Sequence, residues 1–321
     1  MKLYRMNSNE TIKYFGNNEE IDIPEYVFKE SDVRGVWVSN VANIDTPKGL
    51  EKEAYQEYLK NMIANIASYN MNTIIFQVRP ASDAYYESKL NPWSRYITGI
   101  EGKNPGFDVL AFVIEEAKKY DIKVHAWMNP YRVSVAALDV EHSTLEDAQQ
   151  AYLESLDDLN FAKRHPEHTI VDGANKIILS PSHPEVIDFV TQSILEVVEN
   201  YDVEGVHIDD YFYPYAKIPY EREEADFLKY RSSEDENFED WRRKNVDKMI
   251  KNIHDELKKS FSKTGKKVWF GISPFAVYRT HISLKEDGWE KGSFHSAGAL
   301  QCYSELYSDV YKWMKEHWID Y

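Results

Sequence analysis

One short pattern occurs three times in this chain. An amphipathic helical segment ends in a Tyr and a turn residue, and an apolar strand follows at once. The three junctions are Tyr69-Asn70 before TIIFQVRP, Tyr120-Asp121 before KVHAWMNP, and Tyr201-Asp202 before EGVHIDDY. Helices that alternate with short apolar strands are typical of β/α units built around a parallel sheet. The pattern therefore predicts an α/β fold.

The same periodicity gives the expected elements along the chain. We expect strands over 34–39, 73–79, 123–129, 204–209 and 268–273, and helices over 49–69, 107–119, 184–200, 236–261 and 303–316. This order favours a (β/α)8 TIM-barrel type of fold, truncated after about five to six β/α units, because HWIDY at the end reads as the start of a sixth strand at Ile319. Such a chain would expose apolar surface and is expected to aggregate or dimerise. The alternative is a complete, open doubly wound sheet of five strands.

The domain organisation follows from where these units begin. Residues 1–30 are too few to bury a core and are expected to form an N-terminal extension, and 31–321 the C-terminally incomplete barrel domain. Two long connections, 131–183 and 210–233, both follow the carboxyl ends of predicted strands. They should therefore lie on the same face of the sheet, where long loops usually build a substrate groove.

Composition excludes several classes of function. A net charge of −16 argues against nucleic acid and against anionic membrane surfaces, whereas a neutral polymer remains a feasible partner. The single cysteine, Cys302, rules out an intramolecular disulfide and a cysteine-based zinc site. No run is apolar enough for a signal peptide or a membrane span, so we expect a soluble protein. We also expect it to work with no cofactor and no metal.

The stretch GVHIDDYFYP at 205–214 holds the strongest candidate site. It places Asp209 and Asp210 directly after a buried strand, where α/β enzymes keep their chemistry. Side chains alternate along a strand, so His207 and Asp209 share one face while Asp210 points elsewhere. The alternative is that an Asp at a strand end only caps the following turn.

Other strand ends also carry polar side chains. The set comprises Asn40 after the first strand, Arg79 and Asp83 after the second, and Asn129, Tyr131 and Arg132 after the third. Planar guanidinium, amide, carboxylate and aromatic groups suit a sugar, whose hydroxyls need paired partners and whose C–H face stacks on rings. Mid-strand Gln77, His125 and His207 can instead form a buried polar network.

The residues also carry a resemblance to a known family. RGVWVSN, IIFQVRPASDAYYES followed by NPWS, HAWMNPYR, SPSHPEV, GVHIDDYFYP and GISPF resemble glycosyl hydrolase-like family 10, from about Arg34 to Tyr321. The resemblance implies a (β/α)8 barrel and glycosidase activity on bacterial envelope glycans, with peptidoglycan glycan strands as the leading substrate class. It also implies a cell-envelope or extracellular location if an export signal has been removed. By this resemblance the cleft is lined by Arg79, Asp83, Asn129, Tyr131, Arg132, Asp209, Asp210 and Tyr211.

Glycoside hydrolysis usually needs two carboxyl groups. GVHID resembles the fourth-strand motif of the α-amylase clan, which implies a nucleophile at Asp209 and a basic partner at His207. We expect Asp209 to act as nucleophile or general base, with Asp83 ranked slightly above Asp210 as the acid. Sugar binding is assigned to Arg79, Asn129, Tyr131, Arg132, His207, Tyr211, Trp93 and Asn40.

Three other functions compete with this reading. A carbohydrate-binding pseudoenzyme would use the same groove without a working acid. A metallohydrolase would use His207 and Asp209 as metal ligands. The third is a structural or partner-binding domain that takes no ligand.

Overall fold

The computed structural model describes residues 1–14, 16–25, 27, 29, 32–281, 292 and 298–321. The chain divides into two compact units, Met1–Arg34 and Gly35–Tyr321. The first unit is held by isolated antiparallel bridges, Lys2 with Asp22, Tyr4 with Thr11, and Lys13 with Glu20. The second unit carries the sheet and the candidate site.

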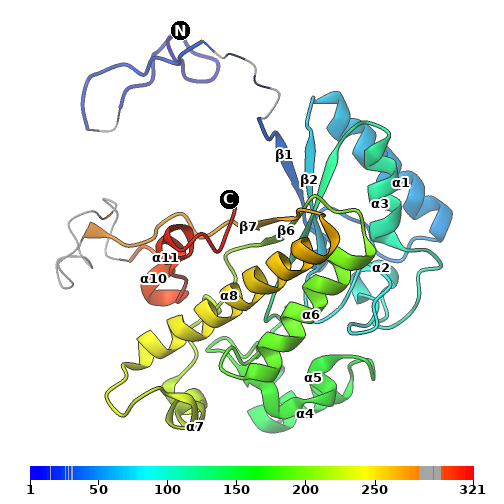
Figure 1. Ribbon diagram of the computed structural model, residues 1–321, viewed down its shortest axis with the longest axis vertical. Helices are drawn as coiled ribbons and strands as arrows, with labels where there is room; N and C mark the ends of the chain where they lie inside the picture. Colours follow the sequence, from blue (N-terminus) through cyan, green and yellow to red (C-terminus); the bar gives the residue numbers. More distant parts are fainter. Residues whose placement is uncertain (15, 26, 28, 30–31, 282–291, 293–297) are drawn as a thin grey trace. The chain divides into compact units, whose positions relative to one another are not determined.

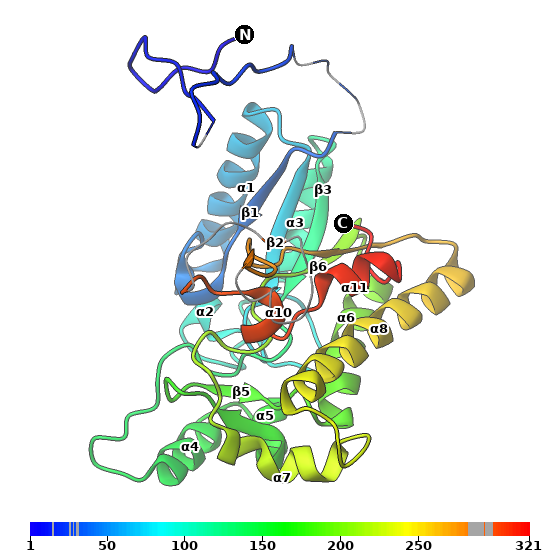
Figure 2. The same ribbon diagram turned by 90° about the vertical axis from the view of Figure 1, so that its left-hand side faces the viewer.

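A five-stranded parallel sheet forms the centre of the second unit (Figures 1 and 2). Its strands are β1 (Gly35–Val38), β2 (Thr73–Arg79), β3 (Lys123–Met128), β6 (Gly205–Ile208) and β7 (Trp269–Ile272). They follow one another in chain order, and each pairs in parallel with the next. This arrangement confirms the predicted α/β class and is the strand order of a barrel of the TIM type.

The last residues of the chain extend the same pattern. The Asp320 amide donates to the carbonyl of Phe270 at 2.8 Å, and the Ile272 amide donates to the carbonyl of Tyr321 at 2.9 Å. Residues 320 and 321 therefore lie along β7, where a sixth strand was expected to start.

The long helices are α1 (Lys52–Ser68), α3 (Val109–Lys118), α6 (Pro184–Asn200) and α8 (Phe238–Thr264). Figures 1 and 2 show α1 beside α3 against the strands, and α6 packs on α8. Asp108 and Asn237 cap α3 and α8 by accepting backbone N–H groups, and Gly265 ends α8 in the left-handed conformation that favours glycine. The single helix expected over 303–316 is instead two short ones, α10 (Cys302–Glu305) and α11 (Val310–Lys315).

The long connections contain structure that the sequence did not predict in detail. The first holds α4 (Leu145–Glu154), α5 (Phe161–Arg164), the short helix η2 (Pro166–His168), and an antiparallel hairpin of β4 (Thr169–Val171) and β5 (Ile177–Leu179). The second holds α7 (Tyr220–Tyr230). Short helices η1 (Val41–Asn43) and α2 (Arg95–Thr98) follow β1 and β2. In Figure 1 α4, α5 and α7 lie together at one end of the second unit, the end at which the sheet strands finish.

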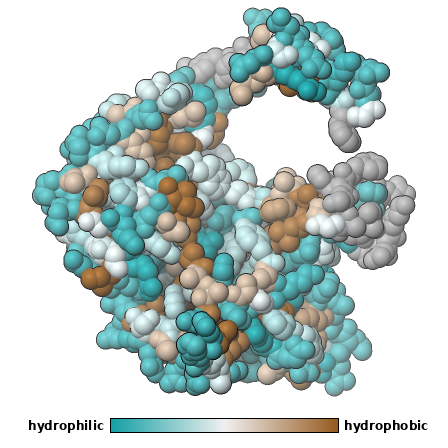
Figure 3. Space-filling view, turned by 180° about the vertical axis from the view of Figure 1, so that it is seen from behind, coloured by the Kyte–Doolittle hydropathy of each residue, from teal (hydrophilic) through white to brown (hydrophobic). Residues whose placement is uncertain are grey.

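The face seen in Figure 3 is largely hydrophilic, with apolar residues in small scattered groups. None of the helices in the described part of the chain combines the length and the hydropathy needed to cross a lipid bilayer.

The register of β2 shifts near its carboxyl end. Simple alternation places Gln77 and Arg79 on one face, but the pairing with β3 shifts between them, so that Arg79 lies opposite Met128. The Arg79 guanidinium consequently packs over the ring of Phe189 on α6, at 5.1 Å from the ring centroid. The local irregularity thus turns Arg79 toward the helix layer.

Candidate active site

Asp209 follows β6 directly, and three hydrogen bonds fix its carboxylate. Oδ2 accepts Nδ2 of Asn129 at 2.7 Å and Nε1 of Trp127 at 3.1 Å, both from β3 or its end, and Oδ1 accepts the backbone N–H of Tyr211 at 3.0 Å. The residue is 9% exposed. All three groups donate to the carboxylate and together hold it in one orientation.

A line of side-chain amides leads from this carboxylate across the sheet. Nε2 of Gln77 donates to Oδ1 of Asn129 at 2.7 Å, and Oε1 of Gln77 accepts the backbone N–H groups of Asn40 and Val41 at 2.7 and 2.8 Å. Asn40 in turn donates through Nδ2 to the Gln77 carbonyl at 2.5 Å. The ends of β1, β2, β3 and β6 are therefore joined by one continuous chain of hydrogen bonds that ends on Asp209.

This line of hydrogen bonds includes two residues that were predicted to bind sugar. Asn40 and Asn129 are fully buried, and their amides are committed to Gln77 and Asp209. Their position fits the orientation of Asp209 better than a direct contact with a sugar.

Aromatic rings and histidines form the layer beneath Asp209. Trp37 meets Trp127 edge-on at 5.1 Å and His207 at 4.6 Å. Nε2 of His207 pairs with Oγ of Ser273 at 3.1 Å, and its Nδ1 with Oη of Tyr321 at 3.2 Å. Burial lowers the pKa of His207 to about 3, so this ring is neutral near pH 7. Its ring nitrogens contact Tyr321 and Ser273 among the described residues, which favours the buried-network alternative over substrate binding.

Asp210 is more accessible than Asp209 and has different surroundings. Both of its carboxylate oxygens accept Oη of Tyr215 at 2.9 Å. Burial raises the pKa of Asp210, and the neighbouring charge of Asp209 raises it further, against the effect of the Tyr215 hydrogen bond. A carboxyl group with a raised pKa beside an ionised one is the arrangement expected of a general acid.

Stacked side chains flank Asp210. The guanidinium of Arg132 lies 4.5 Å from the ring centroid of Tyr211 and donates through Nη1 to the carbonyl of Pro80 at 2.9 Å. Tyr215 meets the same Tyr211 ring edge-on at 5.2 Å and is 51% exposed. The prediction of site residues missed Tyr215, although the DDYFYPY cluster of aromatic residues after β6 pointed to it.

Arg79 makes the contacts of a bracing residue. It is 1% exposed, and it donates to Oδ1 of Asn91 at 3.1 Å and to the carbonyls of Asn129 and Pro130 at 2.6 and 3.3 Å. Burial lowers its pKa to about 10, so it stays charged near neutral pH. These contacts favour a structural role for Arg79, in which it braces the strand ends, over a role in sugar binding.

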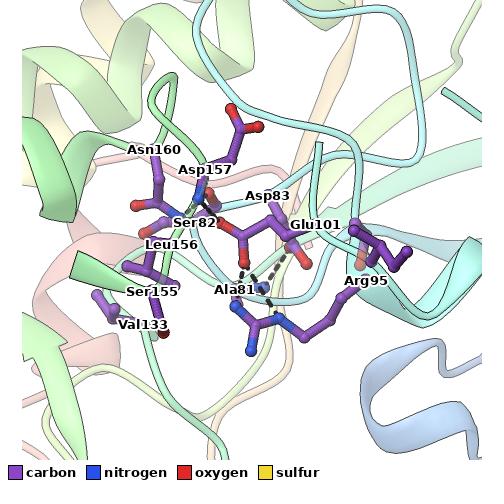
Figure 4. A network of polar contacts seen from close by, with 12 residues as sticks. Ala81, Ser82, Asp83, Arg95, Glu101, Val133, Ser155, Leu156, Asp157 and Asn160 are labelled. Carbon is purple, nitrogen blue, oxygen red and sulfur yellow. Dashed lines mark hydrogen bonds and ion pairs between the residues drawn. The ribbon is translucent and has the colours of Figure 1, made fainter. Parts of the chain in front are cut away.

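Asp83 lies in a separate polar cavity of about 220 Å³, lined among others by Arg95, Tyr96, Glu101, Tyr152 and Asn160. Figure 4 shows Glu101 between Arg95, with which it forms an ion pair, and Asn160, whose Nδ2 donates to it at 2.9 Å. Burial raises the pKa of Asp83 to about 6, and Glu101 adds to that rise, while hydrogen bonds from Ser94 and the Ala81 amide oppose it. The charges of Glu101 and Arg79 thus affect the pKa of Asp83, whereas the charge of Asp209 affects the pKa of Asp210.

Two further predicted residues lie nearby with fewer polar contacts. Tyr131 is fully buried, and its hydroxyl has no hydrogen-bond partner among the described residues. Trp93 is partly buried and bridges in parallel to Ala84 in the loop after β2.

Together, the parallel β/α units and the oriented carboxylate at a strand end define a class of α/β proteins that carry their site on the carboxyl edge of the sheet. A sequence model described as glycosyl hydrolase-like 10 matches residues 32–321, and the chain belongs to this family.

Relatives named as glycosyl hydrolases agree with that assignment. The chain is 39% identical over 309 residues to glycosyl hydrolase YngK of Bacillus subtilis (94% of this chain, 55% of YngK). It is 32% identical over 300 residues to glycosyl hydrolase DigH of Escherichia coli K12 (90% of this chain, 64% of DigH). The chain therefore spans between half and two thirds of these relatives. Alpha-L-fucosidase isoenzyme 2 from Paenibacillus thiaminolyticus aligns with a TM-score of 0.46 at 14% identity, over 79% of this chain and 34% of the fucosidase.

Proposed function

We propose that this chain carries the catalytic groups of a glycoside hydrolase that acts on a bacterial cell-envelope polysaccharide, with peptidoglycan glycan strands as the substrate. The observation that carries the proposal is the carboxylate of Asp209, held at the end of β6 by Trp127, Asn129 and the Tyr211 amide. The family membership and the names of the relatives, both called glycosyl hydrolases, support it.

Asp209 is the nucleophile or general base in this proposal. A rigid, ionised carboxylate stabilises the positive charge that develops on the sugar ring in the oxocarbenium-like transition state. Its three donors hold the side chain in one orientation, so little reorganisation is needed during the reaction.

Asp210 is the preferred general acid, which reverses the ranking made from the sequence. Its pKa is raised by burial and by Asp209, and it remains partly exposed to an incoming glycan. Asp83 has a raised pKa too, but it is 3% exposed and sits in the cavity with Glu101. The exposed ring of Tyr215 and the Arg132–Tyr211 stack offer the flat and planar groups that bind a sugar beside Asp210.

The test is hydrolysis of purified glycan strands freed of their stem peptides, followed by new reducing ends and by mass spectrometry of the products. Asp209→Asn keeps the shape and removes the charge, so we expect at least about a thousandfold loss of turnover, roughly 4 kcal/mol, with glycan binding retained. Asp121→Asn is the matched control, because Asp121 is exposed and has a positive φ that Asn tolerates. Turnover of Asp209→Asn equal to that of the wild type would refute the assignment.

A second substrate separates the two carboxylates. An aryl glycoside with a good leaving group does not need protonation of the departing oxygen. Asp210→Asn should therefore lose activity on glycan strands but retain it on the aryl glycoside, whereas Asp209→Asn should lose both. Glycan binding without any product from the wild type would indicate the carbohydrate-binding pseudoenzyme instead.

A further inference from the structure

A cluster of histidines and carboxylates lies outside the candidate active site. His168 ends the short helix η2, and His183 and Glu185 stand at the start of α6, in the SPSHPEV segment. One potential ligand atom from each of these three residues lies within 4.8 Å of the others. The proposed hydrolase mechanism uses none of them.

The hydrogen bonds determine which nitrogen of His183 is free. Its Nε2 lies 2.9 Å from Oδ2 of Asp226 on α7, and a carboxylate can only accept, so Nε2 carries the proton. The same oxygen accepts Oγ of Ser182 at 2.9 Å, which anchors the carboxylate. Nδ1 of His183 therefore presents a lone pair, and it points at Nδ1 of His168 at 3.0 Å.

His168 faces the same point from the other side, and its carboxylate neighbour lies farther away than a hydrogen bond. Its Nε2 lies 3.7 Å from Oε1 of Glu167, while its Nδ1 faces His183. Both rings thus turn Nδ1 toward one point and Nε2 toward a carboxylate. A carboxylate hydrogen-bonded to the other ring nitrogen, as Asp226 is to His183, is the usual outer partner of metal-binding histidines, because it fixes the tautomer and raises the basicity of the ligating nitrogen.

We propose that His168 and His183 bind one zinc ion between their Nδ1 atoms, with the Glu185 carboxylate as third ligand and water as fourth. Zinc–nitrogen bonds of about 2.1 Å at a tetrahedral angle put two nitrogens roughly 3.4 Å apart. The observed 3.0 Å needs only a small separation of the rings, and zinc takes the place of the direct contact between the two nitrogens. Two imidazoles and a carboxylate suit zinc better than magnesium or calcium, which prefer oxygen ligands.

The surroundings hold both rings before any metal arrives. Phe161 stacks on the His168 ring at 6.0 Å, and Tyr230 meets His183 edge-on at 5.6 Å. The Ser180 amide donates to the carbonyl of His168 at 2.8 Å, which fixes η2 to the end of β5. The ion would therefore join η2 to α6 directly and to α7 through Asp226, and it should stabilise the long connection after β3.

The experiment is titration of the chelator-treated full chain with zinc sulfate by isothermal calorimetry, with the melting temperature recorded with and without zinc. We expect one zinc per chain, a higher melting temperature with zinc, and no response to magnesium chloride. His168→Ala should weaken zinc binding at least about a hundredfold, and Asp226→Asn about ten- to a hundredfold. His142→Ala, a change at an exposed histidine, should bind as the wild type does.

The folding of the variants needs a control of its own. His183→Ala is not used as a test, because it would remove a buried ring. Near-ultraviolet circular dichroism in the absence of metal should be unchanged for His168→Gln, which serves as the second variant. Cobalt in place of zinc should give the intense visible bands of a tetrahedral site in the wild type, and weak bands in His168→Gln. Absence of saturable zinc binding, or equal affinity in the wild type and both His168 variants, would overturn the proposal. Neither readout depends on glycan hydrolysis, so failure of one proposal leaves the other standing.

Discussion

At the scale of single residues, Arg79 and Asp83 are two buried charged groups whose surroundings differ. Arg79 donates to two main-chain carbonyls and to Asn91, and Phe189 covers its guanidinium. Asp83 has a raised pKa because it is buried. Each therefore makes a separate prediction about stability.

Removal of Arg79 should affect folding more than chemistry. Arg79→Ala leaves the carbonyls of Asn129 and Pro130 without their donor, and we expect the free energy of unfolding to fall by about 2–4 kcal/mol. Activity per folded molecule should fall less than about tenfold. Arg79→Lys should recover little stability, since a point charge cannot reproduce the planar fork. Denaturant unfolding and turnover of the folded fraction separate the two effects, and an intact melting temperature with lost activity would restore the sugar-binding role.

Asp83 should make the protein less stable as the pH rises from about 4 to about 7. Its pKa in the folded protein is about 6, above the ordinary 3.8, so between these values the unfolded chain has released a proton that the folded chain still holds. The unfolded state then binds fewer protons, and stability falls with pH by about 3 kcal/mol in total.

The measurement compares wild type and Asp83→Asn by denaturant unfolding at several pH values. The stability advantage of the wild type over the variant should shrink by about 3 kcal/mol between pH 4 and pH 7. Asp121→Asn should show no such trend. A difference between wild type and Asp83→Asn that is independent of pH would mean that Asp83 ionises normally.

At the scale of elements, local periodicity predicted the sheet well. The strand predicted over 73–79 and the helix over 184–200 have the bounds of β2 and α6, and the other strands agree within one residue at each end. The hairpin β4–β5, the helix α7 and the turn of Arg79 toward α6 were not predicted in detail. Their form depends on partners far away in the sequence, such as the pairing of Arg79 with Met128, and periodicity within one segment does not contain that information.

The close approach of β3 and β6 gives a prediction about glycine. Gly205 lies opposite His125, and a Cβ at this position would lie 2.7 Å from Nδ1 of that ring. Gly205→Ala should therefore destabilise the protein by about 1–3 kcal/mol. In a His125→Ala background the same change should cost less than about half as much, because the clash is gone. Gly298→Ala, where the added carbon meets none of the described residues within 4 Å, is the control for thermal unfolding.

At the scale of the whole molecule, the sequence predicted where the site lies better than what each residue does there. Polar residues at strand ends were expected on one edge of the sheet, and Asp209, Asn129, Gln77 and Asn40 do form one hydrogen-bonded line there. The sequence did not decide between a binding role and a structural role for Arg79 and His207, because burial and partner choice are set by tertiary packing. The His168–His183 pair was missed for the same reason, since its members lie on separate elements.

Because the chain divides into two units, we expect the second unit to stay folded after proteolysis removes the first. The Met1–Arg34 unit has its own bridges, and Lys29 is exposed. Limited trypsin treatment should cut after Lys29, and the remaining fragment should keep its melting temperature and its activity on glycan strands. Mass spectrometry identifies the cut. A fragment that unfolds or loses activity would show that the first unit supports the second.

The amide line from Asn40 through Gln77 and Asn129 to Asp209 also constrains how this protein can evolve. Each side chain in the line is a hydrogen-bond partner of the next. A change at one position therefore leaves a buried donor or acceptor without a partner at another. The four positions should accordingly be inherited as a block across related sequences, lost together where catalysis is abandoned and seldom exchanged singly. A library randomised at Gln77 alone should return almost only glutamine, whereas one randomised at positions 77 and 129 together should return new compatible pairs.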